Sequence, residues 1–245
     1  MNARILLATT RRVLQQLRHD PRTIALLVVV PTVLIALLDW ILSSVPGAFD
    51  TWGAMLLGIF PLVAMFLVTS VATLRERSGG TLERLLALPV GKADFLLGYG
   101  LAFGLAAFGQ ALVVSGVAFG LLKLDVAGPV LAVTTVAVLV AVLGSSLGLF
   151  VSAFARTEFQ AVQFMPALII PQLLLCGLLG PRDGLPSALH AVSDVLPLSY
   201  AVDAMKQLSS SPTLDGGFWL DLVVVAGSVV VALALGSATL RRRTP

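Results

Sequence analysis

The sequence contains six apolar runs, each long enough to cross a lipid bilayer as a helix. A transmembrane helix needs about 20 consecutive, predominantly apolar residues to cover the hydrocarbon core. Charged residues make up 12% of the chain, whereas soluble domains average about 25%, so a soluble fold is excluded. We therefore predict an all-α membrane protein with one transmembrane domain over residues 1–245. The six predicted spans are residues 24–43, 52–74, 93–122, 129–154, 159–180 and 217–240.

The basic residues are divided unevenly between the two sides that six spans define. Of the 16 Lys and Arg residues, all but three flank the spans at the termini, between the second and third spans, or between the fourth and fifth. The other side carries Lys123, Arg182 and Lys206. Cytoplasmic loops carry an excess of Lys and Arg. We therefore expect a multi-pass protein of the inner (plasma) membrane with both termini in the cytoplasm and the connection 181–216 outside.

Residues 1–22, ahead of the first span, have the pattern of an amphipathic interfacial helix. Four apolar residues recur with helical spacing, and three arginines at seven-residue intervals lie beside them. Helices of this kind lie in the membrane interface with basic side chains toward anionic headgroups. The alternative is that these arginines only set the topology. The apolar residues are Leu6, Val13, Leu14 and Leu17, and the arginines are Arg4, Arg11 and Arg18.

The predicted spans are almost free of charge and carry no catalytic motif. Charges inside a membrane usually mark ion or proton pathways, so an ion-coupled secondary transporter has no visible carrier residue here. The sequence has no phosphate loop, and one cysteine and two histidines are too few for a metal centre. We expect no catalytic site and no cofactor on this chain, so that energy comes from a partner. Neutral polar residues within the spans are expected to hydrogen-bond between helices; they are Gln110, Ser145, Ser146, Gln163 and Gln172.

The connection 75–92 is predicted to contain a short amphipathic helix. Gly79-Gly80 interrupts the helix of the second span, Thr81 can cap a new one, and Pro89 ends it. A helix of two turns is too short to fold alone, and its apolar face suits docking into a groove on a soluble partner. The alternative is a connector whose leucines rest on the bilayer. The face consists of Leu82, Leu85 and Leu86, with Glu83 at its edge and Arg84 nearly opposite.

The connection 181–216 is far longer than the other outer loops and is predicted to be helical in two parts. Leu185, Leu189, Val192 and Leu196 follow helical spacing, and Pro197 then breaks the helix. A second helix can start near Tyr200. Two such helices can dip into the outer leaflet if protein or a water-filled cavity covers the irregular backbone. The alternative is a surface loop with two interfacial helices.

Two motifs in these connections resemble those of one family. Residues 76–89 read ERSGGTLERLLALP, which resembles the E-x-x-x-G-T-L-E-x-L-L-x-x-P signature of ABC-2 type transporter permeases. Residues 196–203 read LPLSYAVD and are similar to that family's L-P-x-[ST]-Y-x-x-[DE] segment before the last span. The number of spans, the N-terminal helix and the long last outer loop extend the resemblance over essentially the whole chain. One departure is Ser78, where many members carry a second acidic residue.

The resemblance implies a permease half that dimerises, with an identical or paralogous half, and docks one nucleotide-binding ATPase subunit per half. It implies that ATP and Mg are bound by that partner and that this chain contacts the bilayer and no nucleic acid. The residues expected to contact the ATPase are Thr81, Leu82, Glu83, Leu85 and Leu86. The residues expected to shape the outer gate are Pro197, Tyr200 and Asp203.

The residues themselves favour an exporter of amphipathic or lipid-like substrates. The spans are apolar, and aromatic stacking platforms for sugars are sparse. The competing functions are an ion-coupled secondary transporter and a membrane-embedded lipid enzyme, for which Glu83 beside Arg84 is a poor catalytic cluster. A dimer is expected because one uncharged six-span bundle has no obvious enclosed pathway. Gly144 and Gly148 form a small-x-x-x-small pattern that suits close packing in such a dimer.

Overall fold

The computed structural model of the chain describes residues 3–79 and 92–239. Within these ranges it is helical, without strands, and six of the helices, namely α2, α3, α5, α6, α7 and α10, are long and apolar enough to cross a membrane. The prediction of an all-α, six-span membrane protein is therefore confirmed. The elements are α1 (Ala3–His19), α2 (Pro21–Leu42), α3 (Ala48–Ser78), α5 (Lys92–Gly120), α6 (Val130–Ser152), α7 (Glu158–Leu175), the 3-10 turn η1 (Arg182–Gly184), α8 (Ser187–Ser193), α9 (Pro197–Ser210) and α10 (Gly216–Thr239).

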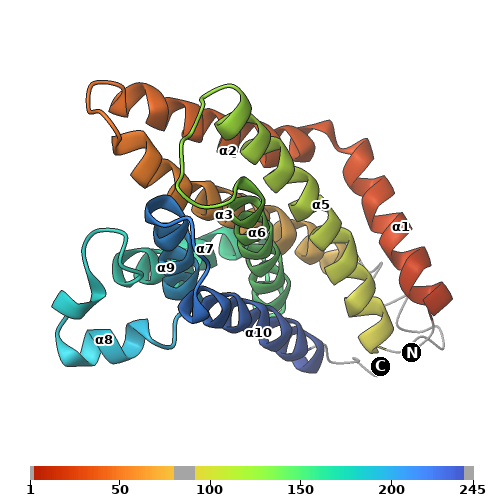
Figure 1. Cartoon of the computed structure of the whole chain (residues 1–245). Coiled ribbons are helices and arrows are strands. Elements are labelled where there is room, and N and C mark those ends of the chain that lie inside the picture. Colours follow the sequence, from red (N-terminus) through yellow and green to blue (C-terminus); the bar gives the residue numbers. More distant parts are fainter. Residues whose placement is uncertain (1–2, 80–91, 240–245) are drawn as a thin grey trace.

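Helices α3 and α6 form the centre of the bundle, and α2, α5, α7, α9 and α10 pack around them (Figure 1). Two glycines of α6 allow the closest approach. A Cβ atom on Gly144 would lie 2.3 Å from the carbonyl oxygen of Leu62, and one on Gly148 would lie 2.6 Å from that of Phe66. Both glycines are buried within one copy of the chain. The expectation that they face a second copy is therefore wrong.

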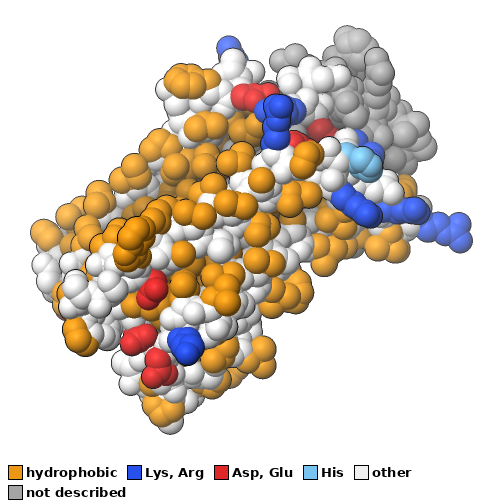
Figure 2. Space-filling model, turned by 90° about the horizontal axis from the view of Figure 1, so that it is seen from above, with side chains coloured by type: hydrophobic (Ala, Val, Ile, Leu, Met, Phe, Trp, Pro, Cys, Tyr) orange, Lys and Arg blue, Asp and Glu red, His pale blue; other side chains and the backbone are white. Residues whose placement is uncertain are grey.

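Apolar and charged side chains occupy different parts of the surface. Figure 2 shows hydrophobic side chains over the middle of the molecule and charged side chains gathered toward two opposite ends. Helix α1 begins and α10 ends on the same side of the molecule, as an even number of spans requires (Figure 1). The apolar middle is the part that a lipid bilayer would surround.

Local sequence signals explain where several helices begin and end. Asp20 caps α2, because its side chain accepts a hydrogen bond from the backbone N–H of Thr23 at 3.2 Å, and Pro21 occupies the first helical position. Helix α7 ends at Leu175, five residues before the predicted end at 180. Gly177 follows in the left-handed region with φ of 84°, a conformation that glycine adopts without strain and that ends the helix.

Polar side chains inside the bundle satisfy the backbone in two ways. The amide of Gln110 donates to the carbonyl of Leu27 at 2.7 Å and joins α5 to α2, which confirms the expected bond between helices. Ser145, Ser146 and Gln172 instead donate to carbonyls within their own helices. The expectation of bonds between helices was therefore wrong for these three, because a short or curled-back side chain reaches the preceding turn of its own helix more easily.

Candidate functional site

The residues predicted to contact an ATPase lie outside the described part of the chain. They are Thr81, Leu82, Glu83, Leu85 and Leu86, and their role stays a prediction. The structure does describe the helix that leads into this connection, α3 up to Ser78, and the backbone of the helix that leaves it, α5 from Lys92. The contacts at the end of α3 therefore decide which other helices would move if a partner displaced the connection.

Three successive side chains at the end of α3 contact three different elements. Glu76 forms an ion pair with Arg12 of α1 at 2.9 Å. Arg75 forms a two-pronged ion pair with Glu158 at the start of α7, at 2.7 and 2.9 Å. Arg77 donates to the backbone carbonyl of Ser152 at the end of α6, at 2.5 Å. The last turn of α3 is thus connected to α1, α6 and α7, immediately before the predicted docking helix.

The ion pair between Arg12 and Glu76 is the better shielded of the two ion pairs here. The two side chains are 29% and 15% exposed, against 56% and 52% for Arg75 and Glu158. Arg12 also donates to the hydroxyl of Tyr99 in α5, and its guanidinium lies 5.6 Å from the centre of that ring. One arginine of α1 therefore holds α3 and α5 together.

Helix α1 lies against α5 along its length, side by side in Figure 1. The hydroxyl of Thr10 donates to the carbonyl of Gly98 at 3.1 Å, and Val13 is 3% exposed. A Cβ atom on Gly98 would lie 2.7 Å from Thr9, so glycine permits this close approach. The predicted apolar face of α1 is thus turned toward protein, while Arg4, Arg11 and Arg18 are exposed.

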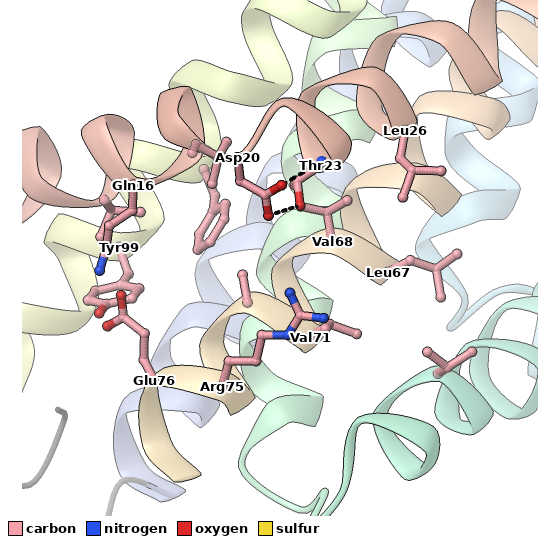
Figure 3. A pocket seen from close by; sticks show the side chains of 15 residues that line it. Gln16, Asp20, Thr23, Leu26, Leu67, Val68, Val71, Arg75, Glu76 and Tyr99 are labelled. Atoms are coloured by element: carbon pink, nitrogen blue, oxygen red, sulfur yellow. Dashed lines mark hydrogen bonds between the residues drawn. The ribbon is translucent and has the colours of Figure 1, made fainter. Parts of the chain in front are cut away.

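A cavity of about 420 Å³ lies between α1, α2, α3, α5 and α7 near these ion pairs. Most of its lining is aliphatic or aromatic. The polar side chains around it include Gln16, Asp20, Thr23, Arg75 and Glu76. In Figure 3 the Arg75 side chain extends toward Asp20 and Thr23, while Gln16 and Glu76 lie beside Tyr99. Hydrogen bonds from the hydroxyl and backbone N–H of Thr23 lower the pKa of Asp20 below its ordinary 3.8, so this carboxyl group is ionised at neutral pH.

At the opposite end of the molecule, one arginine organises the connection 181–216. Arg182 forms ion pairs with Asp194 and, at 2.6 Å, with Asp203 of α9. Its Nε atom donates to the hydroxyl of Ser193 at 2.8 Å, and that hydroxyl donates to the carbonyl of Leu175 at 2.8 Å. The Arg182 side chain is 15% exposed. Together, these bonds tie η1, α8 and α9 to the end of α7.

The three predicted gate residues differ in how they take part in this cluster. Asp203 pairs directly with Arg182. The ring of Tyr200 lies 5.7 Å below the Arg182 guanidinium, and its hydroxyl donates to the backbone carbonyl of Asp194 at 2.7 Å. Pro197 occupies the first turn of α9, where its missing N–H costs nothing. The structure therefore brings Tyr200 and Asp203 together through Arg182, while Pro197 sets the start of the helix.

Helix α9 is part of the bundle. Its buried face packs against α3, α6 and α10, and the backbone N–H of Gly128 donates to the carbonyl of Leu208 near its end at 2.8 Å. Non-helical backbone next to membrane helices needs such cover from protein. Helix α8 is more exposed, with Leu189 at 43% and Val192 at 48%. The buried residues of α9 are Leu198, Ser199, Ala201, Val202, Ala204, Met205 and Leu208.

Sequence reasoning missed the residues that organise both ends. Arg182 counted only toward the charge balance, although it was one of three basic residues on its side, and that rarity was the available signal. The contacts of Arg12 had no signal in the sequence, because its partner Glu76 is 64 residues away and its partner Tyr99 is 87 residues away. Among the described residues, no group of three His, Cys, Asp or Glu side chains is placed to hold a metal ion.

Comparison with known proteins gives one consistent family. The model of the family described as ABC-2 type transporter matches residues 4–208. The chain is 24% identical over 184 residues to the probable multidrug ABC transporter permease YbhR of Escherichia coli, covering 74% of this chain and 50% of that protein. It is 30% identical over 176 residues to nodulation protein J of Rhizobium meliloti, covering 69% of this chain and 64% of that protein.

A third relative is much longer than this chain. ABC transporter G family member 20 of Dictyostelium discoideum is 30% identical over 141 residues, which cover 58% of this chain and 19% of that protein. The matched region spans about half the length of the YbhR protein and a smaller part of the Dictyostelium protein. The region that the family model matches, residues 4–208, contains both sequence motifs and five of the six spans, and α10 (Gly216–Thr239) lies beyond it.

Proposed function

The chain belongs to the ABC-2 type transporter family, and from this premise we propose that it is the membrane subunit of an ATP-binding cassette exporter. It moves an amphipathic or lipid-like substrate out of the cytoplasm with energy from a separate ATPase subunit that binds ATP and Mg. The observation that carries the proposal is the last turn of α3. It bears the first residues of the family signature and is tied to α1, α6 and α7.

In this proposal the predicted helix at 81–88 is the contact through which the ATPase moves the permease. A push on this helix reaches α3 directly, because the two are continuous in sequence. The shielded ion pair of Glu76 with Arg12 then carries α1 along, and the direct packing of α3 against α7 carries α7. Because interfaces of packed helices are bistable rather than continuously deformable, a small displacement at this contact can reorient several spans together.

The outer cluster around Arg182 is proposed as the gate that opens in response. It joins α9 to the end of α7 through ionic and hydroxyl hydrogen bonds. Such contacts are geometrically specific and break together. A movement of α7, passed on through its packing against α3, would separate Arg182 from Asp203 and release α9.

The substrate class is inferred from the spans themselves. Apolar side chains cover most of the middle of the molecule (Figure 2), which suits cargo that partitions into the membrane. YbhR is named as a probable multidrug permease. That name describes YbhR and agrees with such cargo. A second half of the same architecture would be needed to enclose a pathway. The two copies, or this chain and a paralogue, would form it in the inner membrane with both termini in the cytoplasm.

The decisive experiment is transport by the purified chain with its co-purified partners in proteoliposomes. The proposal predicts that an ATPase co-purifies, that efflux of a lipophilic fluorescent dye requires ATP and Mg, and that collapse of the proton gradient leaves efflux unchanged. Efflux that follows the proton gradient and ignores ATP would instead establish the secondary transporter. An enzymatic conversion of lipid without efflux would establish the lipid enzyme.

A separate experiment checks the orientation. In a variant without Cys176, single cysteines at 183–195 should react with an impermeant maleimide added outside, and those at 76–84 should not. The reverse pattern would overturn the proposed topology.

A further inference from the structure

We infer that the cavity between α1, α2, α3, α5 and α7 binds an organic ammonium group carried on an apolar body, with Asp20 as the carboxylate that receives it. The inference deepens the proposed export function by naming a chemical class of substrate and a place within one copy of the chain. The volume of the cavity, about 420 Å³, falls within the roughly 300–1,000 Å³ typical of pockets for small ligands.

The charges around the cavity point to a cation. Glu76 is paired with Arg12, and Arg75 is paired with Glu158, so these four charges cancel. Asp20 also lines the cavity, and within the described residues it forms no ion pair. Its partners are the hydroxyl and N–H of Thr23, which are neutral. Arg75 also lines the cavity, and its charge adds to the Thr23 hydrogen bonds in lowering the pKa of Asp20. Because Arg75 is shared with Glu158, the five charged groups together leave one net negative charge beside a largely apolar cavity, where a cation is favoured.

The walls fit the rest of such a molecule. Val13, Leu17 and Val68 present aliphatic surface, and Phe103 presents an aromatic ring. Figure 3 shows Asp20 and Thr23 on one side of the space and Leu67 and Val71 on the other. A ligand can therefore place its charged group at the junction of α1 and α2 while its apolar body lies against α3.

The cavity is open toward the apolar surface of the molecule. Leu26 of α2 and Val162 of α7 belong to its lining, and they are 57% and 43% exposed. A molecule already dissolved in the membrane can reach the cavity between these two helices without crossing water. Two sources supply this chemistry: a soluble lipophilic cation that has partitioned into the bilayer, and the amine headgroup of phosphatidylethanolamine.

Binding is tested directly on the full-length chain in nanodiscs, with tetraphenylphosphonium as the probe and tetraphenylborate as an anion of similar shape. No ATPase is needed, so failure of binding and failure of the proposed transport are separate results. The wild type should bind the cation saturably, and its binding of the anion should not depend on Asp20. The variant Asp20→Asn should bind the cation about tenfold more weakly, the effect of losing one charge-assisted contact.

The Asp20→Asn variant removes the charge and keeps the helix cap, because Asn is as good an N-cap residue as Asp. Its matched control is Asp215→Asn, since Asp215 accepts a hydrogen bond from the N–H of Phe218 at the start of α10 in the same way. The control should bind like the wild type. A second variant, Val71→Phe, fills the space and should also weaken binding while leaving Asp20 in place.

The two sources are separated by the lipid of the nanodisc. If the headgroup is the native ligand, phosphatidylethanolamine should compete with the probe more than phosphatidylglycerol does, and Asp20→Asn should abolish that difference. If a dissolved cation is the ligand, binding should be the same in both lipids once the uptake by protein-free nanodiscs of each lipid is subtracted, because anionic phosphatidylglycerol concentrates the cation by itself. Cation binding that is absent in the wild type, or equal in the wild type and both cavity variants, would overturn the inference.

Discussion

The two ends of the molecule use arginine–carboxylate contacts in different ways. At the end proposed to be outer, Arg182 alone joins two carboxylates and a buried hydroxyl, with 15% of its side chain exposed. At the other end, two arginines form two separate pairs, one shielded and one exposed. The outer cluster therefore depends on one residue, whereas the inner contacts are shared. This difference suits the proposed roles of the two ends. An outer gate that depends on one arginine can open in a single step, whereas inner contacts that are shared between two ion pairs can persist while the helices move.

The largest expected effect follows from removing the outer arginine. Arg182→Ala leaves Asp194 and Asp203 without the arginine that pairs with them and should lower the free energy of unfolding by roughly 2–3 kcal/mol. Thermal unfolding of the detergent-solubilised protein measures this. The control is Arg156→Ala, an exposed arginine without an ion pair in the described part of the chain, which should change little. Equal effects of both substitutions would show that the outer cluster has no special role.

The shielded inner pair should show a smaller but measurable coupling. A double-mutant cycle of Arg12→Ala and Glu76→Ala should give an interaction free energy of about 1–1.5 kcal/mol, because both side chains are mostly shielded and one hydrogen bond joins charged groups. Hydrogen exchange of α1 should rise in each single variant, since Arg12 holds this helix against α3 and α5. Additive effects in the cycle would mean that the contact contributes nothing.

The cap at the junction of α1 and α2 should contribute about as much as one hydrogen bond. Asp20→Ala should cost about 1 kcal/mol, and Asp20→Asn only a few tenths, because Asn retains the cap. The pKa of Asp20 is lowered in the folded chain. Its ionised form therefore stabilises the fold at pH values above its ordinary pKa of 3.8, and this stabilisation is lost as the pH falls through the lowered pKa. The stability difference between wild type and Asp20→Asn, measured against pH, should therefore be constant near neutrality and change only below that value.

The smallest effect is expected for the exposed inner pair. Its side chains are more than half exposed, and such pairs contribute about 0–0.5 kcal/mol. A double-mutant cycle of Arg75→Ala and Glu158→Ala should fall in this range and vanish at high salt. A coupling as large as that of Arg12 with Glu76 would contradict the ranking of the two pairs by burial.

The sequence predicted the parts of the fold that depend on local pattern. Apolar length identified all six spans, with ends mostly within a few residues. The predicted break at Pro197 is confirmed, but the next helix begins at Pro197 itself and not near Tyr200. The end of α7 was misplaced, because the left-handed turn at Gly177 has no signal that distinguishes it from other glycines in a membrane helix. The roles of Gly144 and Gly148 were misassigned, because a small-residue pattern shows that something packs closely without showing what.

The candidate site was less predictable because it depends on contacts distant in sequence. The family signature singled out Glu76, but only the fold shows that its partner is Arg12. Helical periodicity predicted the apolar face of α1, although the part of that face at Val13 is covered by protein. Tyr200 and Asp203 were expected at the outer gate, yet Arg182, which joins them, was counted only as a charge. The partners of Arg12 and Arg182 are determined by tertiary packing, and the periodicity of the sequence does not predict which helices pack together.

We propose that an ATPase moves this chain through the predicted helix at 81–88. The most direct measurement is ATPase co-purification together with transport for Leu85→Asp, which puts a carboxylate on the apolar face, and for Glu83→Lys at its edge. The control, Arg84→Asp, adds the same carboxylate on the opposite face. All three variants should reach the membrane in normal amounts. Leu85→Asp should lose the ATPase and transport, since an unpaired buried charge costs several kcal/mol. Glu83→Lys should weaken both, and the control should retain them. Full ATPase binding and transport in Leu85→Asp and Glu83→Lys would show that the ATPase does not act through this helix.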